Sequence, residues 1–236
     1  MNFTLNNLTK TSLNWLFPKK CLSCKKTPQK NHPCCESCYN ELPFQSHTCQ
    51  QCGQRLTANS DHCGRCINEP PVFDSCFCPF QYKDIIKITI QQFKYYEKPE
   101  LGHVLAQLLE FELQENTIEL PELIIPVPLH IRRLRHRGYN QSLLLAKALS
   151  KKLDIPIAQD FIRKHKNTDT QVGLTSKKRQ KNLNRSFHIK KHFKAKSVAI
   201  IDDVVTSGAT ANEISKILKK NGVDYVQVWG VAHTIN

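Results

Sequence analysis

The sequence predicts an α/β protein that carries a small cysteine-rich module at its N-terminal end. The first observation is the run Val198–Ile201, which is short, continuous and apolar, and which breaks abruptly into two acids. Such a run is typical of a strand that is buried on both faces and surfaces at its C-terminal end. Residues 211–220 follow with apolar side chains at helical spacing, which completes a strand, a loop and a helix. The second observation is a set of four Cys-x-x-Cys pairs. A chain of 236 residues is long enough for both an α/β domain and a small cysteine-rich module.

The four cysteine pairs predict metal sites. The pairs repeat every 14 residues. A turn of this kind places two thiolates on one side of a tight loop, and two turns complete a tetrahedral zinc site. Four turns therefore predict two Zn²⁺ ions, which are structural because four thiolates leave zinc no open position. The predicted ligands are Cys21, Cys24, Cys35, Cys38, Cys49, Cys52, Cys63 and Cys66.

The four turns can be paired in two ways. In a sequential arrangement the first turn pairs with the second and the third with the fourth, and ten residues separate the turns of each site. A cross-braced arrangement joins the first turn to the third and the second to the fourth. We favour the sequential arrangement because it closes shorter loops. Cys34 is left out, because only Cys35 has the two-residue spacing to Cys38.

Disulfides are the main alternative to zinc. Residues 1–17 hold scattered apolar side chains interrupted by Asn and Thr, which differs from the unbroken apolar segment of a signal peptide, and no stretch approaches a membrane span. We therefore expect a cytoplasmic protein with a short amphipathic helix at its start, in which the thiols stay reduced. Pro70 and Pro71 end the cysteine module. The expected domains are residues 1–70 and 71–236.

Strand and helix patterns alternate through the rest of the chain. We expect strands at 72–82, 123–130 and 223–231, and helices at 85–93, 101–113 and 143–153. Cys76 and Cys78 are two residues apart and would share one face of the first strand, where packing in the core is their expected role. Asn221 and Gly222 form a helix-stop signal ahead of the last strand.

The loop that follows the two acids has the chemistry of a ribose-phosphate site. Its backbone N–H groups, its hydroxyls and the positive end of the next helix would bind a phosphate, and a glycine lets the backbone approach closely. The acids cannot bind phosphate, and would accept hydrogen bonds from a sugar diol or help to hold a divalent cation. The candidate residues are Asp202, Asp203, Thr206, Ser207, Gly208, Ala209 and Thr210. The alternative is an ordinary turn capped by Thr206 or Thr210.

The charge of the chain points to an anionic partner. The formal net charge is +14, and basic residues cluster at 132–137, 177–181 and 190–196. A solvated surface explains any single cluster, whereas the three together favour a polyanion.

Three motifs carry a resemblance to a known family. Residues 198–210 resemble the phosphoribosyl pyrophosphate (PRPP) motif of type I phosphoribosyltransferases, and more particularly that of the ComF/GntX-like competence proteins. Pro126–Leu129 together with Arg137–Gln141 resembles a second signature of that family. Residues 163–187 resemble a third, through Thr170, Gln171, Leu174, Arg179, Asn182 and Phe187.

The resemblance implies a fold and a site. The fold is a type I phosphoribosyltransferase-like parallel sheet flanked by helices, with the ligand at the C-terminal ends of the strands and a double zinc ribbon in front. The loop residues already named would bind PRPP with Mg²⁺, and Lys94, Tyr95 and Arg137 would contact its pyrophosphate. Asn140 and Gln141 would fix the loop before the helix. Residues 163–187 would close over the substrate or contact a nucleic acid backbone.

The resemblance is compatible with two functions. The first is a cytoplasmic competence protein that handles incoming single-stranded DNA in natural transformation, beside a DNA-uptake helicase or other competence proteins. The second is an active phosphoribosyltransferase that uses PRPP and an unidentified nitrogen base. A structural adaptor held by its zinc module is a third interpretation. The expected DNA-binding residues are Arg132, Arg133, Arg135, Lys178 and Arg179.

Overall fold

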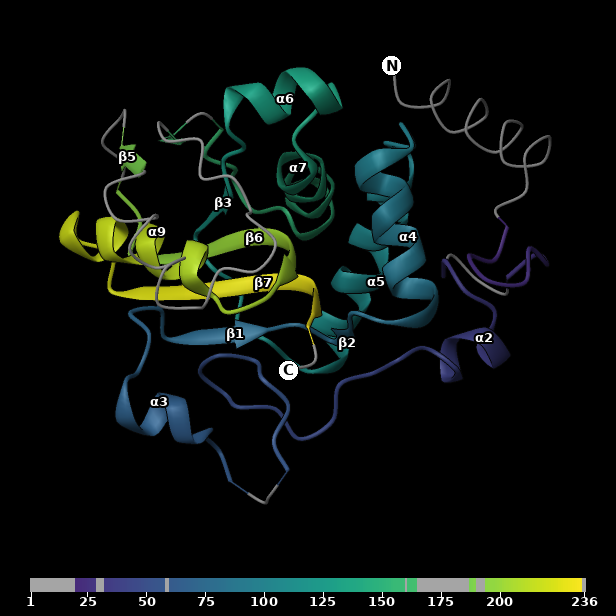
Figure 1. Cartoon of the computed structure of the whole chain (residues 1–236), viewed down its shortest axis with the longest axis horizontal. Helices are drawn as coiled ribbons and strands as arrows, with labels where there is room; N and C mark the ends of the chain where they lie inside the picture. Colours follow the sequence, from purple (N-terminus) through teal and green to yellow (C-terminus); the bar gives the residue numbers. More distant parts are fainter. Residues whose placement is uncertain are drawn as a thin grey trace, which may run out of the picture. The chain divides into compact units, whose positions relative to one another are not determined.

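A computed structural model describes residues 20–28, 32–57, 60–159, 161–164, 187–189 and 194–234 of the chain (Figure 1). By its internal contacts the chain divides into two units, Met1–Leu42 and Pro43–Asn236. The cysteines from Cys49 onwards therefore belong to the second unit. This division differs from the domain boundary expected at residue 70.

The first unit contains one short helix, α2 (Glu36–Asn40), in its described residues. The helix begins directly after Cys35, which is its N-cap. The backbone N–H of Leu22 donates to the carbonyl of Pro33 at 2.9 Å, which brings the two cysteine turns of this unit together.

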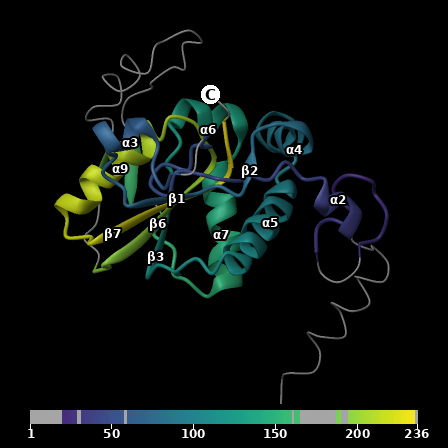
Figure 2. The same cartoon turned by 90° about the horizontal axis from the view of Figure 1, so that it is seen from below.

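The second unit contains a parallel sheet with helices on both faces (Figure 2). Its described helices are α3 (Gly64–Asn68), α4 (Asp84–Tyr95), α5 (Leu101–Glu115), α6 (Ile131–Arg137), α7 (Gln141–Leu153) and α9 (Ala209–Lys220). Its described strands are β1 (Ser75–Phe77), β2 (Phe80–Gln81), β3 (Leu123–Pro126), β4 (Ile162–Lys164), β5 (Phe187–Ile189), β6 (Ser197–Val205) and β7 (Tyr225–His233). The helices expected at 85–93, 101–113 and 143–153 are confirmed as α4, α5 and α7.

The strand order of the sheet is β1-β7-β6-β3, with β2 also paired to β7, and every pairing is parallel. Helices α5 and α7 lie on one face and α9 on the other (Figure 2). Because both faces are covered, the central strands β6 and β7 are buried along most of their length, and Val198–Ile201 of β6 form a continuous apolar run. Residues 226–233 of β7 are all buried, so the strand expected at 223–231 is confirmed as β7 and is covered on both faces.

β6 is longer than the sequence predicted. Pairing with β7 continues beyond the two acids to Val205, which lies opposite His233. The reason lies in β7, where Gly230 stands opposite Asp202 and has no side chain to obstruct the end of the sheet. A Cβ on Gly230 would lie 2.8 Å from Cys78 Sγ and 2.9 Å from Val205 Cγ2. The two acids therefore lie within the C-terminal half of β6, where strand pairing fixes their backbone positions.

A separate antiparallel pair, β4 and β5, brings Phe161, Ile162 and Phe187 into the core beside α9. The same core includes Cys49, Cys52 and Cys66. Burial of Cys76 and Cys78, whose sulfur atoms lie 3.8 Å apart, confirms their packing role. Among the helices of the described residues, none is both long and apolar enough to cross a membrane.

Candidate functional site

The eight paired cysteines gather into two groups of four. The first tetrad comprises Cys21, Cys24, Cys35 and Cys38, and the second tetrad comprises Cys49, Cys52, Cys63 and Cys66. Within each tetrad the sulfur atoms lie within 4.8 Å of one another, so the sequential pairing is confirmed. A tetrahedral zinc ion places its four sulfurs about 3.8 Å apart, which fits both groups. None of the eleven cysteines forms a disulfide.

Both tetrads begin with the same turn but differ in what packs against it. The residue after the second cysteine is left-handed in each, with φ of 65° at Lys25 and 72° at Gly53. Lys25 is exposed, so the first turn accommodates a side chain. A Cβ on Gly53 would lie 3.0 Å from the sulfur of Cys76 in β1. The second turn is therefore packed against the sheet.

The predicted phosphate loop, residues 206–208, joins β6 to α9. Gly208 is the N-cap of α9 with φ of 70°, and no side chain in the described part of the chain caps this helix. The alternative, in which Thr206 or Thr210 caps the helix, is therefore not observed. The N–H groups of the first helical turn are left to bind another acceptor, at the positive end of the helix dipole.

The second acid at the end of β6 is held in an ion pair. Lys94 Nζ, in the last turn of α4, lies 2.9 Å from Asp203 Oδ1, and both side chains are largely buried. Burial alone would lower the pKa of Lys94, but the attraction of Asp203 outweighs it and the pKa lies above its ordinary value. Lys94 is therefore charged at neutral pH. The sequence predicts that these two residues bind different parts of a ligand, and the structure brings them into contact.

The first acid accepts two hydrogen bonds. Ser142 Oγ donates to Asp202 Oδ1 at 3.0 Å, and the backbone N–H of Asp203 donates to the same oxygen at 2.9 Å. Burial, reinforced by the charge of Asp203, raises the pKa of Asp202 to about 7. Ser142 was missed as a site residue. Its position in the first turn of α7, directly after the Arg137–Gln141 signature, was the available signal.

Arg137 and Tyr95, two of the predicted pyrophosphate residues, contact each other. Arg137 Nη2 donates to the Tyr95 hydroxyl at 3.3 Å, and Arg137 Cζ lies 4.9 Å from the centroid of the Tyr95 ring. Arg137 Nη1 donates to Gln141 Oε1 at 3.2 Å. Because a guanidinium can only donate, this contact fixes the orientation of the Gln141 amide.

The amide nitrogen of Gln141 is consequently a donor without an acceptor. Gln141 is 2% exposed, and Nε2 has no hydrogen-bond partner among the described residues. An unsatisfied buried donor costs free energy, so such an atom indicates that a ligand or a water molecule accepts from it.

The segment between α6 and α7 is held by side-chain hydrogen bonds. Asn140 Oδ1 accepts from the N–H of Leu143 at 3.4 Å, and Asn140 Nδ2 donates to the carbonyl of Val127 at 3.1 Å. The hydroxyl of Tyr139 donates to the carbonyl of Phe93 in α4. Asn140 therefore caps α7 and also ties this segment to the end of β3.

The predicted DNA-binding residues fall into two groups. On α6, Arg132 and Arg135 are exposed and Arg133 is half-buried. The imidazole of His130 caps this helix by accepting from the N–H of Arg132 at 3.3 Å. Lys178 and Arg179 lie outside the described residues, as do Thr170, Gln171, Leu174 and Asn182 of the third signature.

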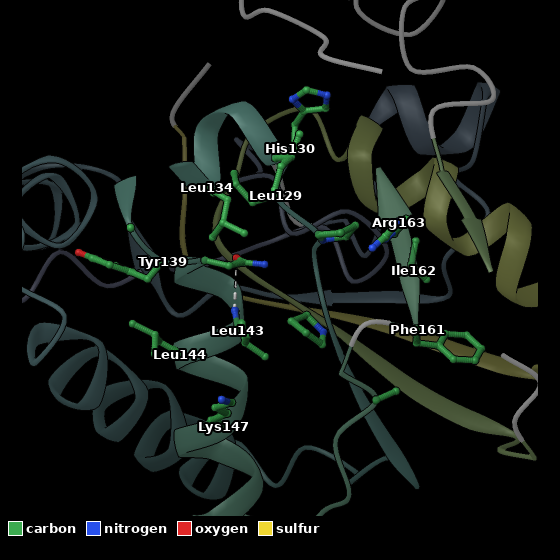
Figure 3. Close-up of a pocket in the computed structure, with 16 residues that line it drawn as sticks. Leu129, His130, Leu134, Tyr139, Leu143, Leu144, Lys147, Phe161, Ile162 and Arg163 are labelled. Atoms are coloured by element: carbon green, nitrogen blue, oxygen red, sulfur yellow. Dashed lines mark hydrogen bonds between the residues drawn. The ribbon is translucent and has the colours of Figure 1, made fainter. Parts of the chain in front are cut away.

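A cavity of about 660 Å³ lies beside the Arg137–Gln141 motif, between the end of β3, α6, α7 and β4 (Figure 3). Leu134, Leu143 and Tyr139 contribute apolar and aromatic surface. Lys147 and Arg163 add two cations to the lining. No local sequence pattern predicts this cavity, because its walls come from segments that are distant in the sequence.

Two family models match the chain. A double zinc ribbon domain matches residues 12–67, and a phosphoribosyl transferase domain matches residues 140–233. The first match spans both cysteine tetrads, and the second spans the segment from α7 to the end of β7.

Curated relatives match nearly the whole chain. Competence protein F of Haemophilus influenzae is 38% identical over 227 residues, which cover 92% of this chain and 97% of the relative. The DNA utilization protein YhgH of Escherichia coli K12 is 31% identical, covering 92% of this chain and 98% of the relative. Competence protein ComFC of Bacillus subtilis is 24% identical, covering 80% and 78%.

Solved structures show weaker likenesses. A glutamine PRPP amidotransferase from B. subtilis matches with a TM-score of 0.40 and 15% identity, over 60% of this chain and 30% of that one. An adenine phosphoribosyltransferase from Saccharomyces cerevisiae matches with a TM-score of 0.38 and 16% identity, over 58% and 71%.

Proposed function

Since the chain belongs to the ComF/GntX-like family of competence and DNA utilization proteins, we propose that it handles incoming single-stranded DNA in the cytoplasm during natural transformation and binds PRPP at the end of β6. The observation that carries the PRPP part is the meeting of Asp202, Asp203 and Lys94 beside the N-terminus of α9. Anions and hydroxyls are recognised there by separate groups. The names of the relatives support the DNA part.

The two ends of a ribose phosphate suit different parts of this site. The N–H groups and hydroxyls from Thr206 to Thr210 would hold the 5′-phosphate at the positive end of α9. Asp202 and Asp203 would accept hydrogen bonds from the ribose diol. Both carboxylates are fixed by β6 and by their own hydrogen bonds, so little ordering would be needed on binding.

The pyrophosphate would lie toward α4 and α7. Arg137 and Lys94 supply positive charge, and Tyr95 orients the guanidinium of Arg137. The unpartnered amide of Gln141 adds a donor next to Arg137, which a pyrophosphate oxygen would satisfy. Mg²⁺ prefers phosphate and carboxylate oxygens, and would accompany PRPP and neutralise part of its charge.

Calorimetric titration with PRPP and Mg²⁺ tests this site. The intact protein should bind, and Asp202→Asn should weaken binding about tenfold or more, because a charge-assisted hydrogen bond is removed. Asp224→Asn is the matched control, since Asp224 is exposed and paired with Lys196 at 3.1 Å. Absence of binding by the intact protein, or equal losses in both variants, would remove the PRPP proposal.

The DNA part of the proposal depends on charge. The exposed arginines of α6 contribute to the net charge of +14, and α6 ends at Arg137, the first residue of the Arg137–Gln141 motif. Basic side chains that neutralise DNA phosphates release counterions, so binding must weaken as salt rises.

Fluorescence anisotropy with a labelled single strand across a salt series tests the DNA part. Arg132→Gln/Arg135→Gln should lower affinity and reduce the slope of log K against log[salt] by about 0.7 for each DNA phosphate that is no longer neutralised. Lys151→Gln, an exposed cation on α7, serves as control. A salt-independent signal, or an unchanged slope in the α6 variant, would contradict the proposal.

A second candidate function is an active phosphoribosyltransferase with a nitrogen-base acceptor. The cavity beside the Arg137–Gln141 motif favours it, because apolar and aromatic walls with a few polar groups suit a planar base. The measurement is release of pyrophosphate from PRPP in the presence of a panel of bases. Release that depends on one base and is abolished in Asp202→Asn would support it, and release with none of them would leave PRPP as a bound ligand only.

A further inference from the structure

The second tetrad contacts the loop at the end of β6. Arg65 lies between Cys63 and Cys66, two members of that tetrad, in α3. Its Nη1 donates to the backbone carbonyl of Ser207 at 3.4 Å, across 142 positions of sequence. A residue of the cysteine module therefore reaches the middle of the predicted phosphate loop.

The contacted carbonyl belongs to the peptide group between Ser207 and Gly208. The described residues contain no cis peptide bond, and in a trans peptide the C=O and the N–H point in opposite directions. A guanidinium on the carbonyl side therefore favours the orientation in which the Gly208 N–H points away from Arg65. It also polarises that N–H, which makes it a better donor to an anion.

Two further contacts hold the same loop from the segment that connects the second tetrad to β1. The ring of Phe73 is buried against Gly208, where an added Cβ would lie 3.2 Å from Phe73 Cζ. The N–H of Val72 donates to Asn212 Oδ1 in the first turn of α9 at 2.6 Å. The conformation of the loop thus depends on the cysteine module and on its connection.

The position of Arg65 depends in turn on the metal. Helix α3 has five residues and no side-chain hydrogen bond at its N-cap, so it is too short to form by itself. Its N-cap Cys63 and its own Cys66 are fixed when a zinc ion joins their sulfurs to those of Cys49 and Cys52. Loss of that ion would release the turn that carries Arg65.

We propose that Arg65 is a positioning residue for the phosphate loop, and that zinc in the second tetrad controls anion binding at the peptide between Ser207 and Gly208. The inference rests on the proposed function, because the anion is the phosphate of PRPP or of a ligand with the same chemistry. Zinc in the first tetrad, which belongs to the other unit, gives the internal control.

Calorimetric titration with PRPP and Mg²⁺ is the first test. Arg65→Met should weaken binding about tenfold, because a charged donor to the loop is removed. Arg65→Lys keeps a charged donor and should restore affinity to within about threefold of the intact protein. Arg55→Met is the matched control, since Arg55 is an exposed arginine of the same module. Zinc content, measured by mass spectrometry, should be unchanged in all three variants.

The NMR chemical shift of the Gly208 amide proton separates this inference from the proposed function. Arg65→Met should move that resonance upfield in the absence of any ligand, because the N–H is no longer polarised through the Ser207 carbonyl, while Arg65→Lys and Arg55→Met should leave it close to its original position. If the intact protein binds no PRPP but Gly208 responds in this way, the proposed function fails and the positioning role stands. An unchanged Gly208 amide in Arg65→Met overturns the inference, whatever the intact protein binds.

The zinc dependence has its own comparison. Cys66→Ser should weaken PRPP binding at least as much as Arg65→Met, and Cys38→Ser should leave it unchanged. Circular dichroism shows whether the sheet of the Cys66→Ser protein remains folded. If it does not, PRPP binding of the intact protein is measured after each phase of zinc removal by a chelator, and a loss that begins with the first phase would overturn the role of the second zinc. Equal effects of the two cysteine variants would overturn the role of the second zinc.

Discussion

The two cysteine tetrads have the same spacing and different surroundings. Each consists of two Cys-x-x-Cys turns separated by ten residues, and in each the sulfurs lie within 4.8 Å of one another. The first tetrad forms a unit with residues up to Leu42, whereas three cysteines of the second tetrad lie in the core of the sheet. The metal chemistry of a ribbon can therefore be predicted from its spacing, but its role is decided by what packs against its turns.

The residue after the second cysteine of each first turn illustrates the difference in surroundings between the two tetrads. After the second cysteine of each first turn, the chain needs a positive φ, and the residues there are Lys25 and Gly53. The lysine is exposed, while the glycine faces the sulfur of Cys76. One backbone requirement is thus met by two residue types, because only the second turn is covered by the sheet.

Removing one zinc ligand from each tetrad should give the largest difference between the two tetrads. Cys66→Ser should lower the stability of the second unit by about 4 kcal/mol or more, because the binding free energy of a structural zinc ion is largely folding free energy. Cys38→Ser should leave that unit unchanged. Native-state hydrogen exchange of β6 and β7 measures the loss. Equal acceleration of exchange in both variants would show that the two tetrads stabilise the same unit.

The turn glycine should give the next largest effect. Gly53→Ala should destabilise the second unit by about 1–3 kcal/mol, because the new Cβ meets a buried sulfur at 3.0 Å and φ is unfavourable for alanine. Lys25→Ala should change stability by less than about 0.5 kcal/mol. Denaturant unfolding followed at the tryptophans gives both values. A neutral Gly53→Ala would mean that the packing against β1 contributes little.

Zinc release should separate the tetrads kinetically. The first tetrad contains an exposed ligand, Cys24, whereas Cys49, Cys52 and Cys66 are buried. A chelator should therefore remove the first zinc at least tenfold faster, because removal of the second needs local opening of the core. Absorbance of a zinc-binding dye follows the two phases. Cys38→Ser, which lacks the first site, should show only the slow phase.

The smallest expected effect is a pH dependence confined to the second unit. The pKa of Asp202 lies at about 7 in the folded protein, compared with 3.8 ordinarily. Between these values the unfolded chain has released a proton that the folded protein keeps, so this group lowers stability as the pH rises from about 4 to about 7. Asp202→Asn should therefore stabilise the second unit at pH 8, on the order of 1 kcal/mol, and less so at pH 5. Thermal unfolding of both proteins at the two pH values measures this stabilisation. A stabilisation of the same size at pH 5 and pH 8 would contradict the raised pKa of Asp202.

Local patterns in the sequence predicted much of this structure. The cysteine spacing identified both tetrads, and the apolar periodicities identified α4, α5 and α7. The end of β6 was misjudged, because its extension to Val205 is decided by β7, where Gly230 opens the space. Strand pairing of this kind depends on a partner that lies far away in the sequence.

For the site residues, too, local motifs could be predicted from the sequence, whereas contacts between distant segments could not. One short motif predicted the loop and its two acids as site residues, and their role stays a prediction. The contacts of Lys94, Ser142 and Arg65 with this motif could not be predicted, because each joins segments that only the fold brings together. The orientation of the Gln141 amide is a further example, since it is set by the neighbouring guanidinium.

The ion pair between Lys94 and Asp203 has a consequence for selectivity. Within the protein the two charges neutralise each other at 2.9 Å in largely buried surroundings. An anion that draws Lys94 away leaves a buried carboxylate without its counterion, which is strongly unfavourable. Sulfate, which carries no hydroxyl at neutral pH, offers nothing to replace that partner. A molecule that presents an anionic group to the lysine and hydroxyl donors to the carboxylate satisfies both residues at once. We therefore expect the pair to disfavour anions without hydroxyl groups and to favour phosphorylated sugars.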